Sequence, residues 1–201
     1  MNLLLSTAYF PPISYVAASL QAEEIVIEQF ETYTKQTCRN RCMICGPNGK
    51  QVLSIPVIRV DGNHTKVKDV RISTHSQWQK NHWRSIETAY NNSPFFLYYR
   101  DLFEPFFLKK FDSLVEFNTS ILKSVFSAIG EERPVAFTDE YEILPADLTD
   151  QRSRLIGKNS KLQFPLYIQC FSEKFGFLSD LSILDLIFNL GPETNQYLAG
   201  L

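Results

Sequence analysis

The chain has 201 residues, of which 44% are hydrophobic, and its 20 basic and 22 acidic residues give a formal net charge of −2. This length and apolar content are sufficient for one hydrophobic core, so we expect a single domain over residues 1–201. The near balance of charge argues against nucleic acid as a partner, because nucleic-acid binding needs a strongly basic surface. An anionic ligand would therefore require a local site.

The amino terminus has a short apolar run that Pro11 and Pro12 interrupt, and no basic residue precedes it. A secretory signal needs a basic segment and a longer apolar segment, so we expect no export. No stretch reaches the roughly 20 apolar residues that a membrane-spanning helix needs. These features predict a cytoplasmic protein without membrane insertion, whose cysteines remain reduced.

The first thirty residues have the pattern of a βαβ unit. We expect a strand at 3–7, a helix at 11–21 that begins with the two prolines, and a second strand within 23–30. Strands joined in this way are parallel, and ligands of such sheets bind beyond the carboxyl ends of the strands. That edge should hold the residues that follow the first two strands: Tyr9, Gln29, Glu31 and Tyr33.

A β-hairpin is expected next, over residues 38–60. Its turn would be Gly46-Pro47-Asn48-Gly49, since these residue types supply the fixed or positive φ angles of a tight turn. Residues 66–73 have the composition of one more strand, which would end near Thr74. Together with the βαβ unit, these strands predict a mixed sheet.

The second half of the chain is predicted to be mainly helical. Apolar residues recur at helical spacing there, with Ser76 as an expected N-cap of the first helix and Asp180 or Ser182 of the last. The expected helices cover residues 76–92, 113–130 and 180–190, and 95–110 is expected to be a shorter helix or a pair of turns. Between them we expect a strand at 134–141, a polar segment at 147–161 and either a strand or an extended segment at 162–171. The fold class is therefore α/β: an N-terminal βαβ unit with a mixed sheet and hairpin, followed by a mainly helical second half.

Three cysteines, Cys38, Cys42 and Cys45, have the C-x3-C-x2-C spacing of the thiolates that hold an iron–sulfur cluster in radical S-adenosylmethionine enzymes. Such a cluster needs a flexible loop, whereas these residues precede and enter a predicted strand, on which Cys45 would face away from the other two. A zinc site lacks a partner at standard spacing. Small thiols are the preferred interpretation, and we expect no metal.

A run of basic residues precedes the hairpin. Lys35, Arg39 and Arg41 would lie on one face of a strand that extends back from the hairpin, with Asn40 between the two arginines. Guanidinium groups bind carboxylates and phosphates through paired hydrogen bonds, so this face is a candidate anion site. A solvated strand face, balanced by Glu28 and Glu31, is an equally weighted alternative.

His82 is adjacent to the apolar stripe of the predicted helix 76–92, which includes Trp83 and Tyr90. It should lie between core and solvent, where a histidine can titrate near neutral pH and reach a ligand. A structural histidine is an equally weighted alternative. We take His82 and Tyr90 as candidate catalytic residues, and Tyr9 and Trp83 as candidate substrate-binding residues.

Several catalytic signatures are missing from the chain: G-x-S-x-G, G-x-x-x-x-G-K-[ST], G-x-G-x-x-G and H-E-x-x-H. Their absence gives no support to hydrolase, P-loop or dinucleotide-binding interpretations.

Four segments in succession resemble the motifs of the WbqC-like protein family. They are STAYFPPISYVAAS, IEQFETYTKQTCRNRCMICGPNGKQVLSIPV, HWRSIETAYNNSPFFLYYRDLFEP and FGFLSDLSILDLIFNLGPE. The resemblance implies work on an activated or amino sugar in bacterial surface polysaccharide (O-antigen type, lipopolysaccharide) biosynthesis. The residues in its most recognisable segments are Lys35, Arg39, Asn40, Arg41, His82, Trp83, Tyr90, Asp185 and Asn189.

Two functional hypotheses follow. The first is a transferase-like enzyme that binds an anionic small molecule such as a sugar nucleotide through Lys35, Arg39, Asn40 and Arg41, with His82 as acid or base. The second is a non-catalytic binding or assembly protein of the same pathway, for which the basic face and the aromatic segment 95–107 form an interface. Neither hypothesis names a cofactor, and self-association is compatible with both.

Overall fold

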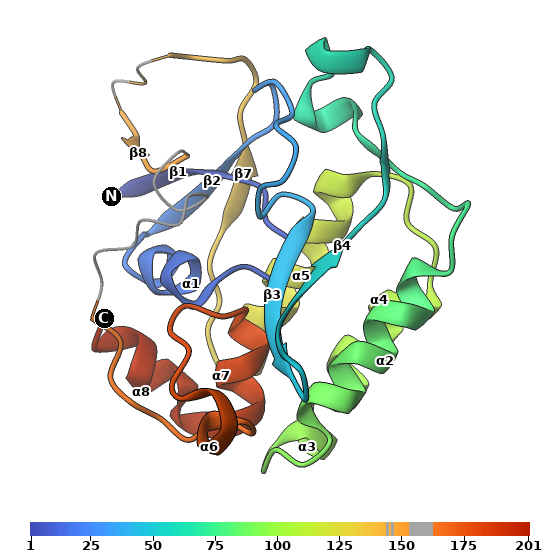
Figure 1. The fold of residues 1–201 in the computed structure, drawn as a ribbon. Coiled ribbons are helices and arrows are strands. Elements are labelled where there is room, and N and C mark those ends of the chain that lie inside the picture. Colours follow the sequence, from blue (N-terminus) through green and yellow to red (C-terminus); the bar gives the residue numbers. More distant parts are fainter. Residues whose placement is uncertain (144, 146, 153–162) are drawn as a thin grey trace.

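A four-stranded parallel sheet is the centre of the computed structural model, which describes residues 1–143, 145, 147–152 and 163–201 (Figure 1). The strand order is β7-β2-β1-β8. The strands are β1 (Asn2–Ser6), β2 (Glu24–Glu28), β7 (Val135–Phe137) and β8 (Thr149–Asp150). β1 and β2 are in register from Asn2 opposite Glu24 to Ser6 opposite Glu28. The predicted βαβ unit is confirmed, with α1 (Ile13–Leu20) as its crossover.

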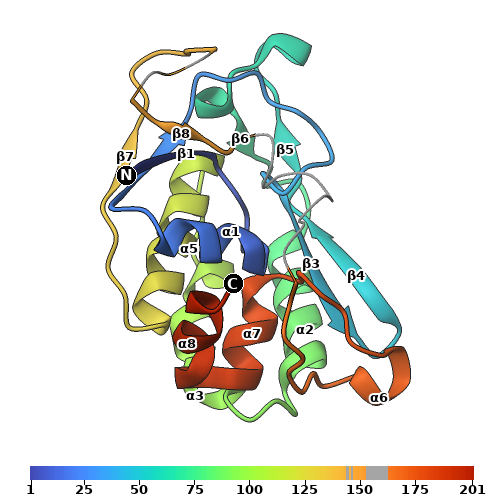
Figure 2. The same cartoon turned by 90° about the vertical axis from the view of Figure 1, so that its left-hand side faces the viewer.

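The two faces of this sheet have different surroundings, because alternate residues of a strand point to opposite sides. One face contributes its side chains to the main hydrophobic core, which it shares with α1 and with α5 (Leu114–Ala128). Figures 1 and 2 show these helices gathered on the same side of the sheet. The core side chains of this face are Leu3, Leu5, Ile25 and Ile27. Leu4 and Val26 point to the other face.

The chain changes direction across the sheet next to β1. From β1 it proceeds to β2 and then to β7 in one direction, and afterwards it returns to add β8 on the opposite side of β1. The β1/β8 boundary is therefore the topological switch point of the sheet. In open parallel sheets, ligands bind at the carboxyl ends of the strands near this point.

Antiparallel strands form two separate ribbons, so parallel and antiparallel strands do not share one sheet. The predicted hairpin is confirmed as β3 (Arg41–Gly46) and β4 (Gly49–Ser54), and Gly49 adopts a φ of 97° in its turn. β5 (Val57–Ile58) pairs with β6 (Arg71–Ile72). Between these two strands lie the 3-10 helices η1 (Gly62–His64) and η2 (Val67–Asp69), so the strand predicted over 66–73 is shorter than expected.

The rest of the described chain is mainly helical, as predicted. The remaining helices are α2 (Trp78–Tyr90), α3 (Phe96–Phe103), α4 (Pro105–Leu108), α6 (Ser172–Phe175), α7 (Ile183–Leu190), η3 (Gly191–Glu193) and α8 (Thr194–Ala199). Ser182 caps α7 as expected, since its hydroxyl accepts from the Leu184 N–H. Ser76 is not the cap of α2, because that helix begins after Gln77.

Two further segment predictions have different outcomes. The predicted segment 147–161 lies largely outside the described residues, while 163–169 has no regular secondary structure. No helix in the described part of the chain is long and apolar enough to cross a membrane. The α/β class is confirmed.

Candidate functional site at the carboxyl edge of the parallel sheet

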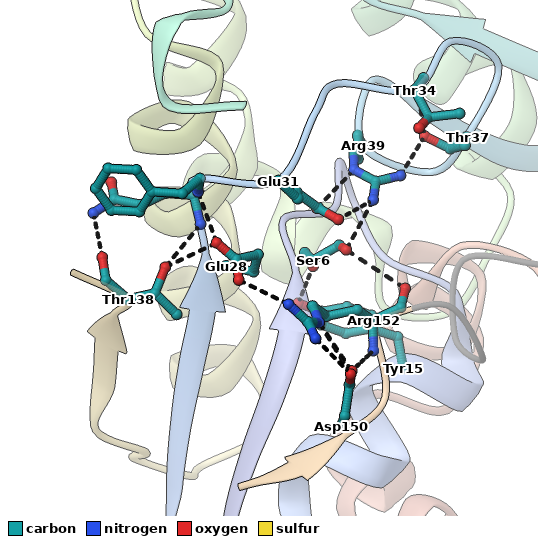
Figure 3. A network of polar contacts seen from close by, with 12 residues as sticks. Ser6, Tyr15, Glu28, Glu31, Thr34, Thr37, Arg39, Thr138, Asp150 and Arg152 are labelled. Atoms are coloured by element: carbon teal, nitrogen blue, oxygen red, sulfur yellow. Dashed lines mark hydrogen bonds and ion pairs between the residues drawn. The ribbon is translucent and has the colours of Figure 1, made fainter. Parts of the chain in front are cut away.

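Polar side chains gather where the parallel strands end, and Figure 3 shows them joined in one network. Ser6 and Glu28 are the last residues of β1 and β2 and are register partners. Thr138 follows β7, and Arg152 comes shortly after β8. The ends of four strands thus contribute one polar side chain each.

Glu28 is fully buried and its carboxylate is the centre of one half of this network. One oxygen accepts from the Phe30 N–H at 2.7 Å and from the Thr138 hydroxyl at 3.0 Å. The other accepts from Arg152 at 2.9 Å. A buried carboxylate is stable only with such partners, and these fix the side chain in a single orientation.

Arg152 connects Glu28 to Asp150. Its guanidinium donates to the Asp150 carboxylate at 2.7 Å and lies 5.0 Å from the centre of the Tyr141 ring. The hydrogen bond from Arg152 lowers the pKa of Asp150, and the same contact raises the pKa of Arg152. Both groups therefore stay charged at neutral pH.

Arg39 is the centre of the other half of the network. Its guanidinium binds the Glu31 carboxylate through two hydrogen bonds of 2.9 and 2.6 Å, and it also donates to the Ser6 hydroxyl at 3.0 Å. Only 5% of Arg39 is exposed. The Asn118 amide donates to the Arg39 carbonyl at 2.8 Å, so α5 holds the loop that bears the arginine.

These buried ions are not required for a stable core. Desolvation of an ion pair costs about as much as its Coulomb attraction returns, and apolar replacements are often neutral or stabilising. A charged network at the switch point of a parallel sheet therefore indicates a binding site more strongly than a stabilising device.

A cavity of about 450 Å³ opens beside the Glu28 end of the network. Leu4 and Val26 form its floor, so it lies on the sheet face opposite the helices. Its described lining includes no lysine or arginine but several carboxylates, which suit ligand hydroxyl and ammonium groups as hydrogen-bond acceptors. These carboxylates belong to Glu28, Asp139, Glu140, Glu142 and Asp147.

The predicted basic strand face is wrong as a structure, because β3 begins only at Arg41 and the preceding residues form turns. Turn residues such as Gln36, with a φ of 62°, break the alternation on which the prediction rested. Lys35 is exposed, and Arg39 is buried against Glu31. Asn40 donates to the Ile55 carbonyl at 2.8 Å. These residues do not form one surface.

The predicted residues Tyr9, His82, Trp83 and Tyr90 all lie in the aromatic core. Tyr9 and Tyr90 are 0% exposed, and burial raises the pKa of both hydroxyls. The Tyr9 hydroxyl is hydrogen-bonded to His82 Nδ1 at 2.9 Å. His82 is buried rather than at the border with solvent, because Trp78 and Tyr9 pack against it. Catalytic roles for His82 and Tyr90 stay predictions, and their burial does not favour them.

Burial of His82 should make stability depend on pH. Burial lowers its pKa to about 4 from 6.5, so between these values the unfolded chain binds a proton that the folded chain does not. The free energy of unfolding should therefore fall as the pH falls from 6.5 to 4, by about 3 kcal/mol at most. Urea denaturation of the wild type and His82→Gln at several pH values measures this contribution as their difference.

The exposed His64 supplies the control for this measurement. His64→Gln makes the same change of side chain without removing a buried imidazole, so it should not reproduce the effect of His82→Gln. Equally steep profiles for His82→Gln and the wild type would contradict the assignment.

The cysteines do not converge on a ligand site. Burial raises the pKa of Cys42, and it raises that of Cys38 to about 12, so these thiols remain protonated at neutral pH. Cys45 is buried in β3, and Cys170 lies in a different segment near Asn189, whose side-chain oxygen accepts from its thiol at 3.5 Å. Across the residues with described positions, no three cysteine, histidine or acidic side chains are grouped to hold a metal.

Asp185 and Asn189 lie in α7, within the core. The Asp185 carboxylate accepts from the Tyr167 hydroxyl at 2.6 Å and from the Gln169 amide at 2.9 Å. Burial raises its pKa, and these hydrogen bonds oppose the rise. The arrangement anchors the irregular segment 163–169 to α7.

From the sequence, Glu31 was expected near the carboxyl edge and Glu28 was named as a counter-charge to the basic run, whereas three other residues of the network had no expected role. Glu28 had a usable signal, since an acidic residue at the end of the apolar strand IVIE is unusual. Ser6, Thr138 and Arg152 had none, because their meeting depends on strands that are distant in sequence.

Comparison with known proteins agrees with the resemblance in the motifs. The model of the WbqC-like protein family matches residues 7–169. The chain belongs to this family. It is also similar to the uncharacterized protein Rv1507c of Mycobacterium tuberculosis (strain ATCC 25618 / H37Rv), with 25% identity over 97% of this chain and 96% of that protein. No solved structure matches the chain. The family match of this WbqC-like protein includes the whole carboxyl-edge network except Ser6.

Proposed function

We propose that this WbqC-like protein is a transferase-like enzyme of bacterial surface polysaccharide biosynthesis that binds an activated sugar at the carboxyl edge of its parallel sheet. The observation that supports this proposal is the charged network of Ser6, Glu28, Arg39 and Arg152 at the switch point, with a cavity beside it. The position is the usual ligand site of an open parallel sheet. The assignment to polysaccharide biosynthesis comes from the family resemblance.

The cavity suits the sugar part of such a ligand. Its carboxylates can accept hydrogen bonds from hydroxyl groups and from the ammonium group of an amino sugar. Phe137, which is 42% exposed, offers an apolar surface at the same cavity. The Thr138 and Glu28 side chains are held in place before any ligand arrives, which reduces the entropic cost of binding.

A matched pair of substitutions tests the proposed site. Glu140 lies three residues after β7, at the cavity, and Glu132 lies three residues before the same strand, at its other end. Glu140→Gln should weaken binding of an activated sugar about three- to tenfold, because one charged acceptor is lost, while Glu132→Gln should not. Calorimetric titration with a panel of sugar nucleotides, including amino sugars, measures both. A wild-type protein that binds none of the panel, or equal affinities for the two variants, would contradict the proposal.

A binding or assembly role is the second candidate. Most of the aromatic segment 95–107 lies in the core, but Leu97 and Tyr98 are 73% and 77% exposed on α3. They form the part of that segment available to a protein partner. A stable partner whose binding is lost in the Leu97→Asp variant, together with no turnover of any activated sugar, would favour this role over the enzyme.

A further inference from the structure

Two guanidinium groups lie near Tyr33, beyond the Arg39 end of the network, and neither pairs with a carboxylate of the described residues. Arg41 is half-buried, and its Nε atom is enclosed without a hydrogen-bond partner among the described atoms. Arg59 is also half-buried, and among the described residues its guanidinium donates to the neutral side chain of Asn63, at 2.7 Å. The residues outside the described part include no aspartate or glutamate that could neutralise them.

Backbone hydrogen bonds bring the three segments of this Tyr33 cluster (Tyr33, Arg41 and Arg59) together. The Tyr33 N–H donates to the Thr65 carbonyl at 2.9 Å, which ties the loop of Arg59 to that of Tyr33. The Ile55 N–H donates to the Asn40 carbonyl at 2.8 Å, which fixes the chain beside Arg41. These backbone contacts hold the three chain segments next to one another.

The electrostatic environment of Tyr33 agrees with this placement. Burial raises the pKa of its hydroxyl, and the charges of Arg39, Arg41 and Arg59 oppose the rise, while no described carboxylate contributes. Glu31 neutralises Arg39, so the net positive charge comes from the other two arginines. The Arg59 loop also contains Asp61, whose side chain is exposed to solvent.

We propose that Tyr33, Arg41 and Arg59 bind a phosphoryl group, which in the proposed function is the anionic part of the activated sugar. A single carboxylate needs one guanidinium, whereas two guanidinium groups and a hydroxyl match the charge and the several oxygens of a phosphate or diphosphate. The identification with a sugar ligand rests on the proposed function; the phosphoryl site itself does not. Of the residues expected to bind an anion, Arg41 keeps that role in this proposal, Arg39 is neutralised by Glu31, and Arg59 is added.

Calorimetric titration of the purified chain with inorganic pyrophosphate tests the site directly. Arg41→Gln and Arg59→Gln should each weaken binding about tenfold or more, and Tyr33→Phe about threefold, because a charged hydrogen bond contributes more than a neutral one. Binding should also weaken with added salt. Arg84→Gln is the control: it removes the same charge beside the turn of the hairpin, roughly 16 Å along β3 from Arg41, and should bind as the wild type does.

Each outcome separates this inference from the proposed function. Failure of the wild type to bind pyrophosphate, or equal affinities for Arg59→Gln and Arg84→Gln, would overturn the phosphoryl site. The Arg59→Gln variant tests the phosphoryl site even if Arg41→Gln unfolds, because the Arg59 side chain is in a surface loop. Thermal melting of each variant checks that it is folded. Tighter binding of acetate than of pyrophosphate would indicate a carboxylate site and also overturn the inference. If pyrophosphate binds through these residues while no activated sugar binds, the phosphoryl site stands and the proposed function fails.

Discussion

Replacing Glu31 by alanine should lower the free energy of unfolding by about 3–5 kcal/mol. The Arg39 and Glu31 side chains are only 6% and 11% exposed, so the substitution leaves a buried guanidinium without its counter-charge. The remaining side-chain acceptors of Arg39 are the neutral hydroxyls of Ser6 and Thr37. Urea denaturation at pH 7 measures the loss.

Two further variants give this prediction its control. Glu104→Ala removes one of the carboxylates that pair with Arg100, the other being Glu87, from a pair whose side chains are 26% and 38% exposed, and should cost no more than about 1 kcal/mol. The double variant Arg39→Met, Glu31→Leu removes both charges together and should regain most of the lost stability. Equal losses for Glu31→Ala and Glu104→Ala would show that the Arg39 pair is not effectively buried.

The double variant also separates stability from function. If the carboxyl-edge network is a binding site, this variant should fold with nearly the stability of the wild type and yet bind the activated sugar more weakly. If the double variant is stable and its ligand affinity is unchanged, the Arg39 half of the network has a structural role and does not take part in binding. The proposed cavity site at Glu140 would then depend on the Glu28 half alone.

The elements that the sequence predicted correctly are those determined by local patterns. The βαβ unit follows from two short apolar strands around an amphipathic helix, and the hairpin follows from the turn residues between Gly46 and Gly49. The helices α5 and α7 follow from apolar periodicity, and α7 also from its predicted cap, Ser182. Each of these signals comes from one continuous stretch of sequence, the longest being the βαβ unit from Asn2 to Glu28.

What the sequence did not predict depends on contacts between distant segments. His82 appeared to border solvent, but Trp78 stacks edge-on against it and Tyr9 covers its ring from a loop over 70 residues earlier. For Arg39 the sequence left an anion site and a charge balance with Glu31 equally open, and the fold brings the Glu31 carboxylate within hydrogen-bond distance of its guanidinium. β8 has only two residues, which are too few to show the alternation of apolar and polar residues that identifies a strand. The strand that defines the switch point was therefore not predicted.

Gly191→Ala should lower the free energy of unfolding by about 4 kcal/mol, through a collision in the core beyond the strain of the backbone. Gly191 ends α7 with φ 55° and ψ −122°, a conformation that side chains with a Cβ rarely adopt. An added Cβ would lie 2.5 Å from both Cγ and Cδ1 of the Phe95 ring. The Phe95 N–H donates to the Phe188 carbonyl at 3.0 Å, so the ring cannot withdraw without disturbing the contact between α3 and α7.

Gly130→Ala isolates the steric part of this effect. Gly130 has a similar φ of 73° at the end of α5, but an added Cβ would meet nothing within 4 Å. Its cost should therefore be the conformational strain alone, about 1 kcal/mol. Chemical denaturation of both variants measures the difference, which should be about 3 kcal/mol. Similar losses at the two glycines would mean that Phe95 moves aside at little cost, and that the packing of α7 against the start of α3 is looser than its aromatic contacts imply.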